Sequence, residues 1–284
     1  MRRYPPPLLG WLRFFLLTLL LAGFSAFEVL SYRWGVAAIV LTLFGWCSGC
    51  NFRLAKKDLL VVFLLSLLRA TTSFSLLIAY QNIATGVAST IHFMYPLAVS
   101  LAMMFFFHEK KSLLVMLAVL MSLFGAALLS SGELEAKSGH TIVGLVAACI
   151  SVFSYGGYII GVRTTRAAQI NSTVLTCYVM GMGAVLYLIG AMATSGLHLV
   201  TDGYIWLIIL GLALPATAIS NITLVRAIKY AGPTLTSILG AMEPLTAVVI
   251  GVFVFKELFT LNSAIGILLI LLAVGMVVFR KQKS

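Results

Sequence analysis

Long apolar segments joined by very short connections constrain this chain more than any other feature. Each segment is close to the roughly 20 apolar residues that a helix needs to cross a bilayer. The connections are too short to hold a soluble domain, and in lipid the backbone must satisfy its own hydrogen bonds, as a helix does. The sequence therefore predicts an all-α membrane protein with ten transmembrane helices, over 9–31, 34–53, 59–80, 86–107, 112–131, 142–162, 173–195, 204–225, 233–255 and 261–279.

Composition agrees with a membrane protein. Apolar residues make up 61% of the chain and charged residues 10%, against about 25% charged in soluble domains.

The N-terminal Arg2-Arg3 pair before an apolar run resembles a secretory signal. That run continues past Leu30 without a convincing small-residue cleavage site, so we expect it to be retained as the first span.

The net charge of +11 reports topology rather than nucleic-acid binding, because no aromatic or groove-reading context accompanies the basic residues. Ten spans place both termini on one side, and that side collects far more lysine and arginine than the other. The positive-inside rule then puts both termini in the cytoplasm, for a protein of the plasma or inner membrane. The richer side holds Arg2, Arg3, Arg53, Lys56, Lys57, Lys110, Lys111, Arg163, Arg166, Arg226, Lys229, Arg280, Lys281 and Lys283, and the other side holds Arg33, Lys137 and Lys256.

An internal repeat relates residues 79–130 to residues 227–278, at an offset of 148 positions without a gap. The shared features include Met-Tyr-Pro over Met-Glu-Pro and a glutamate 13 positions after the proline, which are Pro96 with Glu109 and Pro244 with Glu257. The topology places Glu109 in the cytoplasm and Glu257 outside. The sequence thus predicts two inverted five-helix repeats, 1–131 and 141–284, joined by an external loop at 132–140, an arrangement typical of secondary transporters.

With these features the chain resembles the drug/metabolite transporter superfamily, and within it the ten-helix EamA-like transporters. The motifs are Ile91-His92-Phe93-Met94-Tyr95-Pro96 through Phe107-His108-Glu109-Lys110, and Ala241-Met242-Glu243-Pro244 through Phe255-Lys256-Glu257. The resemblance implies a carrier of small molecules that does no covalent chemistry and needs no cofactor. It implies an exporter of amino acids or other metabolites, working by alternating access as a monomer or homodimer.

Two charges are predicted at the same depth of the membrane. Arg69 and Glu243 each lie ten residues into a span, on spans 3 and 9, or roughly 15 Å from the same face. A charge at the centre of a helix costs about 2.5–3.5 kcal/mol on insertion scales, so an opposite pair at one level is favourable. Two interpretations stay open at this stage, namely substrate or proton handling and a structural ion pair that locks the helices together.

Other polar residues within spans complete the candidate site. Tyr95 is the repeat counterpart of Glu243, and His92 lies one turn earlier on the same face, where an imidazole can titrate. Tyr155 and Tyr158 lie three residues apart in span 6 and are candidates for substrate contact or for packing. Glu28, near the outer end of span 1, is a candidate gate residue or an interfacial one.

The sequence also bears on energy source and on other functions. It contains no G-x-x-x-x-G-K-[ST] motif, so ATP-driven transport by this chain alone is not expected, and coupling to protons, to exchange or to neither stays open. A membrane enzyme would need a catalytic set, yet Asp58 and Asp202 stand alone. A sensor or assembly factor would be expected to carry a soluble partner-binding region. Both remain alternatives to transport.

Overall fold

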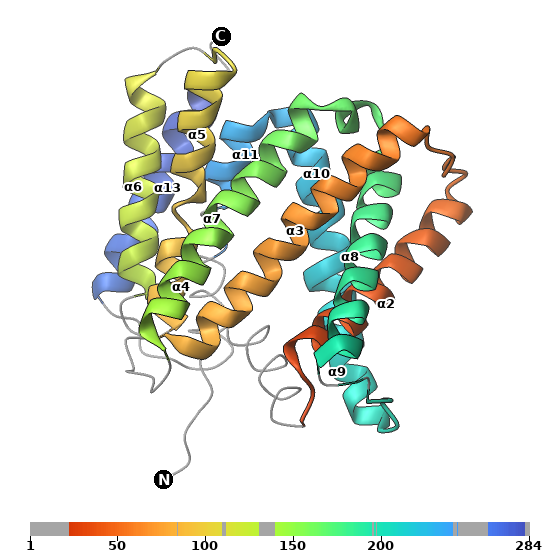
Figure 1. The fold of residues 1–284 in the computed structure, drawn as a ribbon. Helices are drawn as coiled ribbons and strands as arrows, with labels where there is room; N and C mark the ends of the chain where they lie inside the picture. Colours follow the sequence, from red (N-terminus) through yellow and green to blue (C-terminus); the bar gives the residue numbers. More distant parts are fainter. Residues whose placement is uncertain are drawn as a thin grey trace. The chain divides into compact units, whose positions relative to one another are not determined.

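The computed structural model describes residues 23–83, 85–109, 112–130, 140–194, 196, 198–240, 243 and 261–281. Every regular element among these residues is helical (Figure 1). Within this described part, six helical stretches are long and apolar enough to cross a membrane, and the shorter apolar helices Leu113–Gly125 and Ala264–Met276 accompany them. The protein is therefore an all-helical membrane protein.

The number ten stays a prediction, because several of the predicted segments lie outside the described residues. These are most of span 1 including Arg13, residues 244–255 of span 9, nearly all of the loop at 132–140, and the Lys256-Glu257 pair.

The first described helix corrects the predicted boundary between spans 1 and 2. Helix α2 covers Ala26–Cys47, and Gly23 precedes it with a φ of 88°, a conformation that glycine adopts at little cost. The Ser25 side chain accepts a hydrogen bond from the Glu28 N–H, and the Glu28 carboxylate accepts one from the Ser25 N–H. This capping box starts the helix at Ala26, so the predicted junction at 31–34 and the predicted end at residue 53 were wrong. Glu28 and Arg33 both lie in α2.

Five other helices begin and end within three residues of the predicted spans. They are α3 (Lys56–Asn82), α6 (Leu113–Ser130), α7 (Thr141–Thr164), α8 (Ser172–Thr194) and α13 (Leu261–Lys281). Charged or polar residues flank several of these apolar runs, such as Lys56 at the start of α3 and Asn171 before α8. Hydropathy therefore located these boundaries well.

Two predicted spans are interrupted at a proline. The span predicted over 86–107 is divided into α4 (Thr85–His92) and α5 (Tyr95–Phe106), with Pro96 in the first turn of α5. Proline has no N–H to donate and its ring clashes with the preceding turn, which breaks a helix locally. The apolar stretch Val87–Phe106 remains long enough to cross a membrane.

The second interruption falls in the stretch Gly203–Ala231, predicted as 204–225. Helix α9 (Gly203–Ala213) is followed by a π-helical segment, η3 (Leu214–Ile219), and then by α10 (Ser220–Ala231). Pro215 lies in the first turn of η3, and the Thr217 hydroxyl donates to the Leu212 carbonyl at 2.9 Å. A π-helical turn inside an α-helix often marks a functional position.

The internal repeat is visible in the helix boundaries. Helix α11 covers Pro233–Gly240, and its bounds match those of α4 after the offset of 148 residues. The same offset carries the first residue of α6 onto the first residue of α13. The two segments therefore share local structure as well as sequence.

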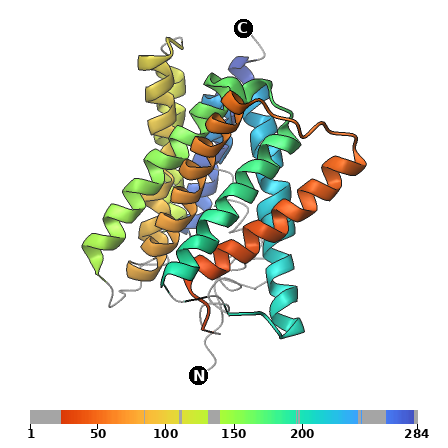
Figure 2. The same ribbon diagram turned by 45° about the vertical axis from the view of Figure 1, so that its right-hand side comes forward.

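The chain forms two compact units, and each unit takes helices from both predicted repeats. Unit 1 comprises Met1–Trp11, Ser75–Ile160 and Ala231–Ser284. Within it α6 packs against α13, and α11 packs against α5 (Figures 1 and 2). A core of Ala118, Val119, Ile238 and Ala273 joins these helices.

Unit 2 comprises Leu12–Phe74 and Gly161–Tyr230. Its main contact is between α2 and α8, and α2 also contacts α9 and η3 (Figure 2). Gly183 and Gly190 let α8 approach α2 closely, because added Cβ atoms would meet the rings of Trp34 and Phe27. Small residues at helix contacts are typical of membrane proteins.

Charged residues of unit 2 join the ends of α3, α7 and α10 to each other and to the connection between α7 and α8. Arg166, in the short η2 helix (Arg166–Gln169), forms a salt bridge with Asp58 at 2.6 Å. Arg163 donates to the Lys229 carbonyl at 2.7 Å, and the Lys229 ammonium donates to the Ile170 carbonyl. All of these residues come from segments that the charge distribution assigns to one side of the membrane.

Candidate functional sites

Three predicted site residues of unit 1, His92, Tyr95 and Tyr155, lie together. With Ser151 they form a group that we call the aromatic cluster. The His92 ring stacks on Tyr155 with centroids 5.4 Å apart, and Tyr95 meets Tyr155 edge-on at 4.6 Å. His92 ends α4, Tyr95 begins α5 at the proline break, and Tyr155 comes from α7. All three side chains are buried, with exposed fractions of 8% or less.

Hydrogen bonding identifies which His92 nitrogen carries a proton. His92 Nδ1 lies 2.9 Å from the Ser151 hydroxyl oxygen. That hydroxyl donates its single proton to the Ala148 carbonyl at 2.6 Å, so it accepts from His92. The proton therefore resides on Nδ1, and in the neutral ring Nε2 is an acceptor.

Helix α11 reaches this cluster through a glycine. A Cβ at Gly240 would lie 1.7 Å from the Tyr95 hydroxyl oxygen, so only glycine allows the observed approach. Gly240 is the repeat counterpart of His92. Tyr158, also predicted as a site residue, lies one turn after Tyr155 on α7 and is fully buried.

Unit 2 contains a second polar group, which we call the arginine cluster: Arg33, Trp34, Arg69, Tyr187 and Asn221. Arg69 is the central residue of the 27-residue helix α3. Its Nε donates to Asn221 Oδ1 at 3.1 Å, and one terminal nitrogen donates to the Ser73 hydroxyl at 3.2 Å. The buried Asn221 amide in turn donates to the Thr217 carbonyl, which ties Arg69 to the π-helical segment.

The rings of Trp34 and Tyr187 form one wall of this cluster. The Arg69 guanidinium carbon lies 6.0 Å from the Trp34 ring centroid, a distance at the limit of cation–π attraction. Trp34 meets Tyr187 edge-on at 5.2 Å, and the Tyr187 hydroxyl donates to the Ala70 carbonyl at 2.6 Å. Arg33 comes from the same helix as Trp34 and is 8% exposed.

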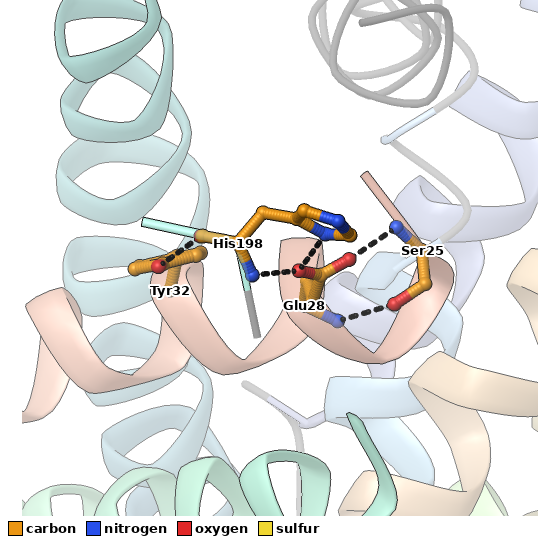
Figure 3. Close-up of polar contacts among 4 residues, drawn as sticks. All are labelled: Ser25, Glu28, Tyr32 and His198. Carbon is orange, nitrogen blue, oxygen red and sulfur yellow. Dashed lines mark hydrogen bonds and ion pairs between the residues drawn. The ribbon is translucent and has the colours of Figure 1, made fainter. Parts of the chain in front are cut away.

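A third group joins the start of α2 to the connection between α8 and α9 (Figure 3). The Glu28 carboxylate, which is fully buried, accepts hydrogen bonds from the His198 N–H at 2.6 Å and from His198 Nδ1 at 2.9 Å. It also accepts the Ser25 N–H at 2.7 Å. The Tyr32 hydroxyl donates to the His198 carbonyl at 2.7 Å. We call these four residues the Glu28 latch.

Comparison with known protein families gives a match over almost the whole chain. The family model described as the EamA-like transporter family matches residues 8–131 and 142–279, almost the whole chain in two segments. The chain belongs to the EamA-like transporter family. This is a family of transporters and not of enzymes.

Solved structures show the same fold. A protein described only as "Crystal structure of protein" is similar to this EamA-like chain with a TM-score of 0.75 and 17% sequence identity, over 94% of each chain. No curated protein matches the sequence.

Two predicted site residues of the EamA-like protein, Glu28 and Glu243, lie outside the aromatic and arginine clusters. Glu28 belongs to the Glu28 latch, at the N-terminus of α2 rather than the end of span 1. Glu243 is exposed, but its neighbours in the sequence lie outside the described residues. Arg69 and Glu243 belong to different units, so their pairing stays a prediction.

Sequence reasoning missed several participants, among them Arg33, Trp34, Tyr187 and His198. The Ser25-x-x-Glu28 capping signature would have moved Arg33 from a loop into a helix. No signal in one sequence would have found the other three. Among the described residues, no group of three His, Cys, Asp or Glu side chains can hold a metal ion.

Proposed function

We propose that this protein is a secondary transporter that exports small metabolites such as amino acids. In the proposed mechanism, the two repeats alternate between an inward-facing and an outward-facing arrangement, and both termini lie in the cytoplasm. Membership of the EamA-like family carries the proposal, because two matched segments cover the chain.

Buried polar groups in apolar helices support this proposal. A charge at the centre of a membrane helix is costly and is a functional candidate by default. Arg69 occupies that position on α3, with polar partners that orient its guanidinium. The aromatic cluster adds ring faces and a histidine acceptor nitrogen, which suit an organic substrate and a coupling proton.

From the sequence we also propose that Arg69 and Glu243 handle substrate or protons as a pair. Arg69→Ala should then abolish transport, since it leaves an uncompensated carboxylate. Adding Glu243→Gln should recover expression, because no orphan charge remains, yet the double variant should stay inactive. A double variant that transports at the normal rate would show that the pair only locks helices.

Metabolite profiling tests the function in cells. Cells that overexpress the protein should release one class of small metabolites into the medium, compared with cells that express Glu243→Gln at the same level. Equal release from both would count against an exporter whose site includes Glu243.

A further inference from the structure

Arg33 is a buried arginine that has no ion-pair partner among the residues that the structure describes. Its side chain lies in α2 and is 8% exposed. Its Nε is covered and has no hydrogen-bond partner. Among the described residues, none forms a salt bridge with Arg33. Burying an N–H donor without an acceptor, as at this Nε, is expensive.

The nearest carboxylate on the same helix is already occupied. Glu28 precedes Arg33 by five residues, which turns the two side chains about 140° apart around the helix. The Glu28 oxygens accept hydrogen bonds from Ser25 and from both His198 donors. Glu28 therefore belongs to a separate network.

The other ionisable groups around Arg33 add no negative charge. Among the described residues, Arg69 from α3 and Tyr187 from α8 interact electrostatically with Arg33. Arg69 is a second cation, and the Tyr187 hydroxyl is committed as a donor to the Ala70 carbonyl. An anion bound at Arg33 would be stabilised by its guanidinium charge.

A second uncommitted donor lies beside Arg33 in the sequence. The Trp34 side chain is fully buried, and its indole N–H has no hydrogen-bond partner. Buried indole N–H groups usually find an acceptor. Among the described residues, unit 2 thus contains two covered donors on α2 that have no acceptor, the Arg33 Nε and the Trp34 indole nitrogen.

We propose that Arg33 anchors an anion-binding site in unit 2, which takes the carboxylate or phosphate group of a small soluble substrate. Planar guanidinium groups bind both kinds of oxyanion through paired N–H donors. The other members of the arginine cluster, among them Arg69 and the rings of Trp34 and Tyr187, belong to the same unit. This choice of substrate class rests on the proposed transport function, whereas binding itself is independent of it.

Thermal unfolding of the purified protein in a neutral detergent tests the site. The probes are sodium acetate, sodium L-aspartate and sodium phosphate, each titrated against sodium chloride at matched ionic strength, with choline chloride as a cationic control. At least one probe should raise the unfolding midpoint of the wild-type protein saturably, since a ligand that binds only the folded state stabilises it. Arg33→Gln should weaken the response to that probe about tenfold or more.

One control variant and one further measurement on Arg33→Gln separate a binding role from a structural one. Arg53→Gln removes an exposed arginine from the connection between α2 and α3 and should keep the full anion response. Without the probes, Arg33→Gln should unfold at or above the wild-type midpoint, because it removes a buried unpaired charge. A large loss of stability in Arg33→Gln without probes would mean that Arg33 is structural, and would overturn the proposal.

Three other outcomes would also overturn it: a wild-type protein that responds to none of the anions, an undiminished response in Arg33→Gln, or stabilisation by the anionic lipid phosphatidylglycerol alone. Failure of the site is distinguishable from failure of the proposed function. Metabolite flux without dependence on Arg33 would reject the site and keep the transporter. Anion binding without flux of any metabolite would keep the site and reject transport.

Discussion

Replacing Gly183 by alanine should separate α8 from α2 in unit 2. An added Cβ would lie 2.2 Å from Cζ3 and 2.4 Å from Cε3 of Trp34. Carbon atoms pack at about 3.5–4.0 Å, so the ring or the helix must retreat by more than about 1 Å. Trp34 has no free space for this movement, because it is fully buried and meets the Tyr187 ring edge-on.

Overpacking of this kind costs about 1–3 kcal/mol. The matched control is Gly211→Ala in α9, where nothing lies within 4 Å of the added Cβ; there the helix should gain up to about 1 kcal/mol. The thermal midpoint of each detergent-purified variant measures the difference. Trp34→Phe removes the ring atoms that clash, so Gly183→Ala combined with Trp34→Phe should lose less stability than the two single variants together.

The opposite results would refute this packing argument. If Gly183→Ala were as stable as Gly211→Ala, α8 could not approach Trp34 as closely as the structure shows. Additive losses in the double variant would mean that the cost of Gly183→Ala arises away from the Trp34 ring.

Three further predictions follow. A reporter fused after Ser284 should be cytoplasmic and one inserted in 133–139 external, and an external C-terminus would contradict both the ten-span count and the inverted repeat. Gly240→Ala should reduce transport in vesicles, because its Cβ would overlap the Tyr95 hydroxyl. Adding Tyr95→Phe to the same chain should relieve part of the clash. Normal flux in Gly240→Ala would remove Tyr95 from the site. Glu28→Gln should lower the free energy of unfolding by about 1–3 kcal/mol, since an amide cannot replace a carboxylate that accepts hydrogen bonds on both oxygens. An unchanged thermal midpoint would show that the Glu28 latch contributes nothing to stability.

The sequence predicted most of the described helices, because hydropathy and helix length are properties of single segments. Helices α3, α7 and α8 begin and end close to their predicted limits. The offset of 148 residues recurs in the bounds of α4 and α11, although neither was predicted as a separate helix. The junction before α2 was misplaced because apolar residues continue through the turn at Gly23, although the capping signature at Ser25 was readable.

The candidate sites were predictable only in part. His92 and Tyr95 were expected on one face because they lie three residues apart, and Tyr155 was expected in a different span. Their contact depends on how α7 packs against the break between α4 and α5, which no local pattern encodes. Arg33 and Tyr187 were missed for the same reason, because their shared environment arises from the packing of α2 against α8.

Reconstituted flux tests the central claim most directly. Purified protein would be placed in vesicles loaded with a cellular metabolite extract, and the metabolites that leave would be identified by mass spectrometry. The account predicts that a small set of metabolites carrying a carboxylate or phosphate group leaves wild-type vesicles faster than protein-free vesicles, and that Arg69→Ala abolishes this release. Release no faster than from protein-free vesicles, for every metabolite in the extract, would contradict the assignment of this protein as a transporter.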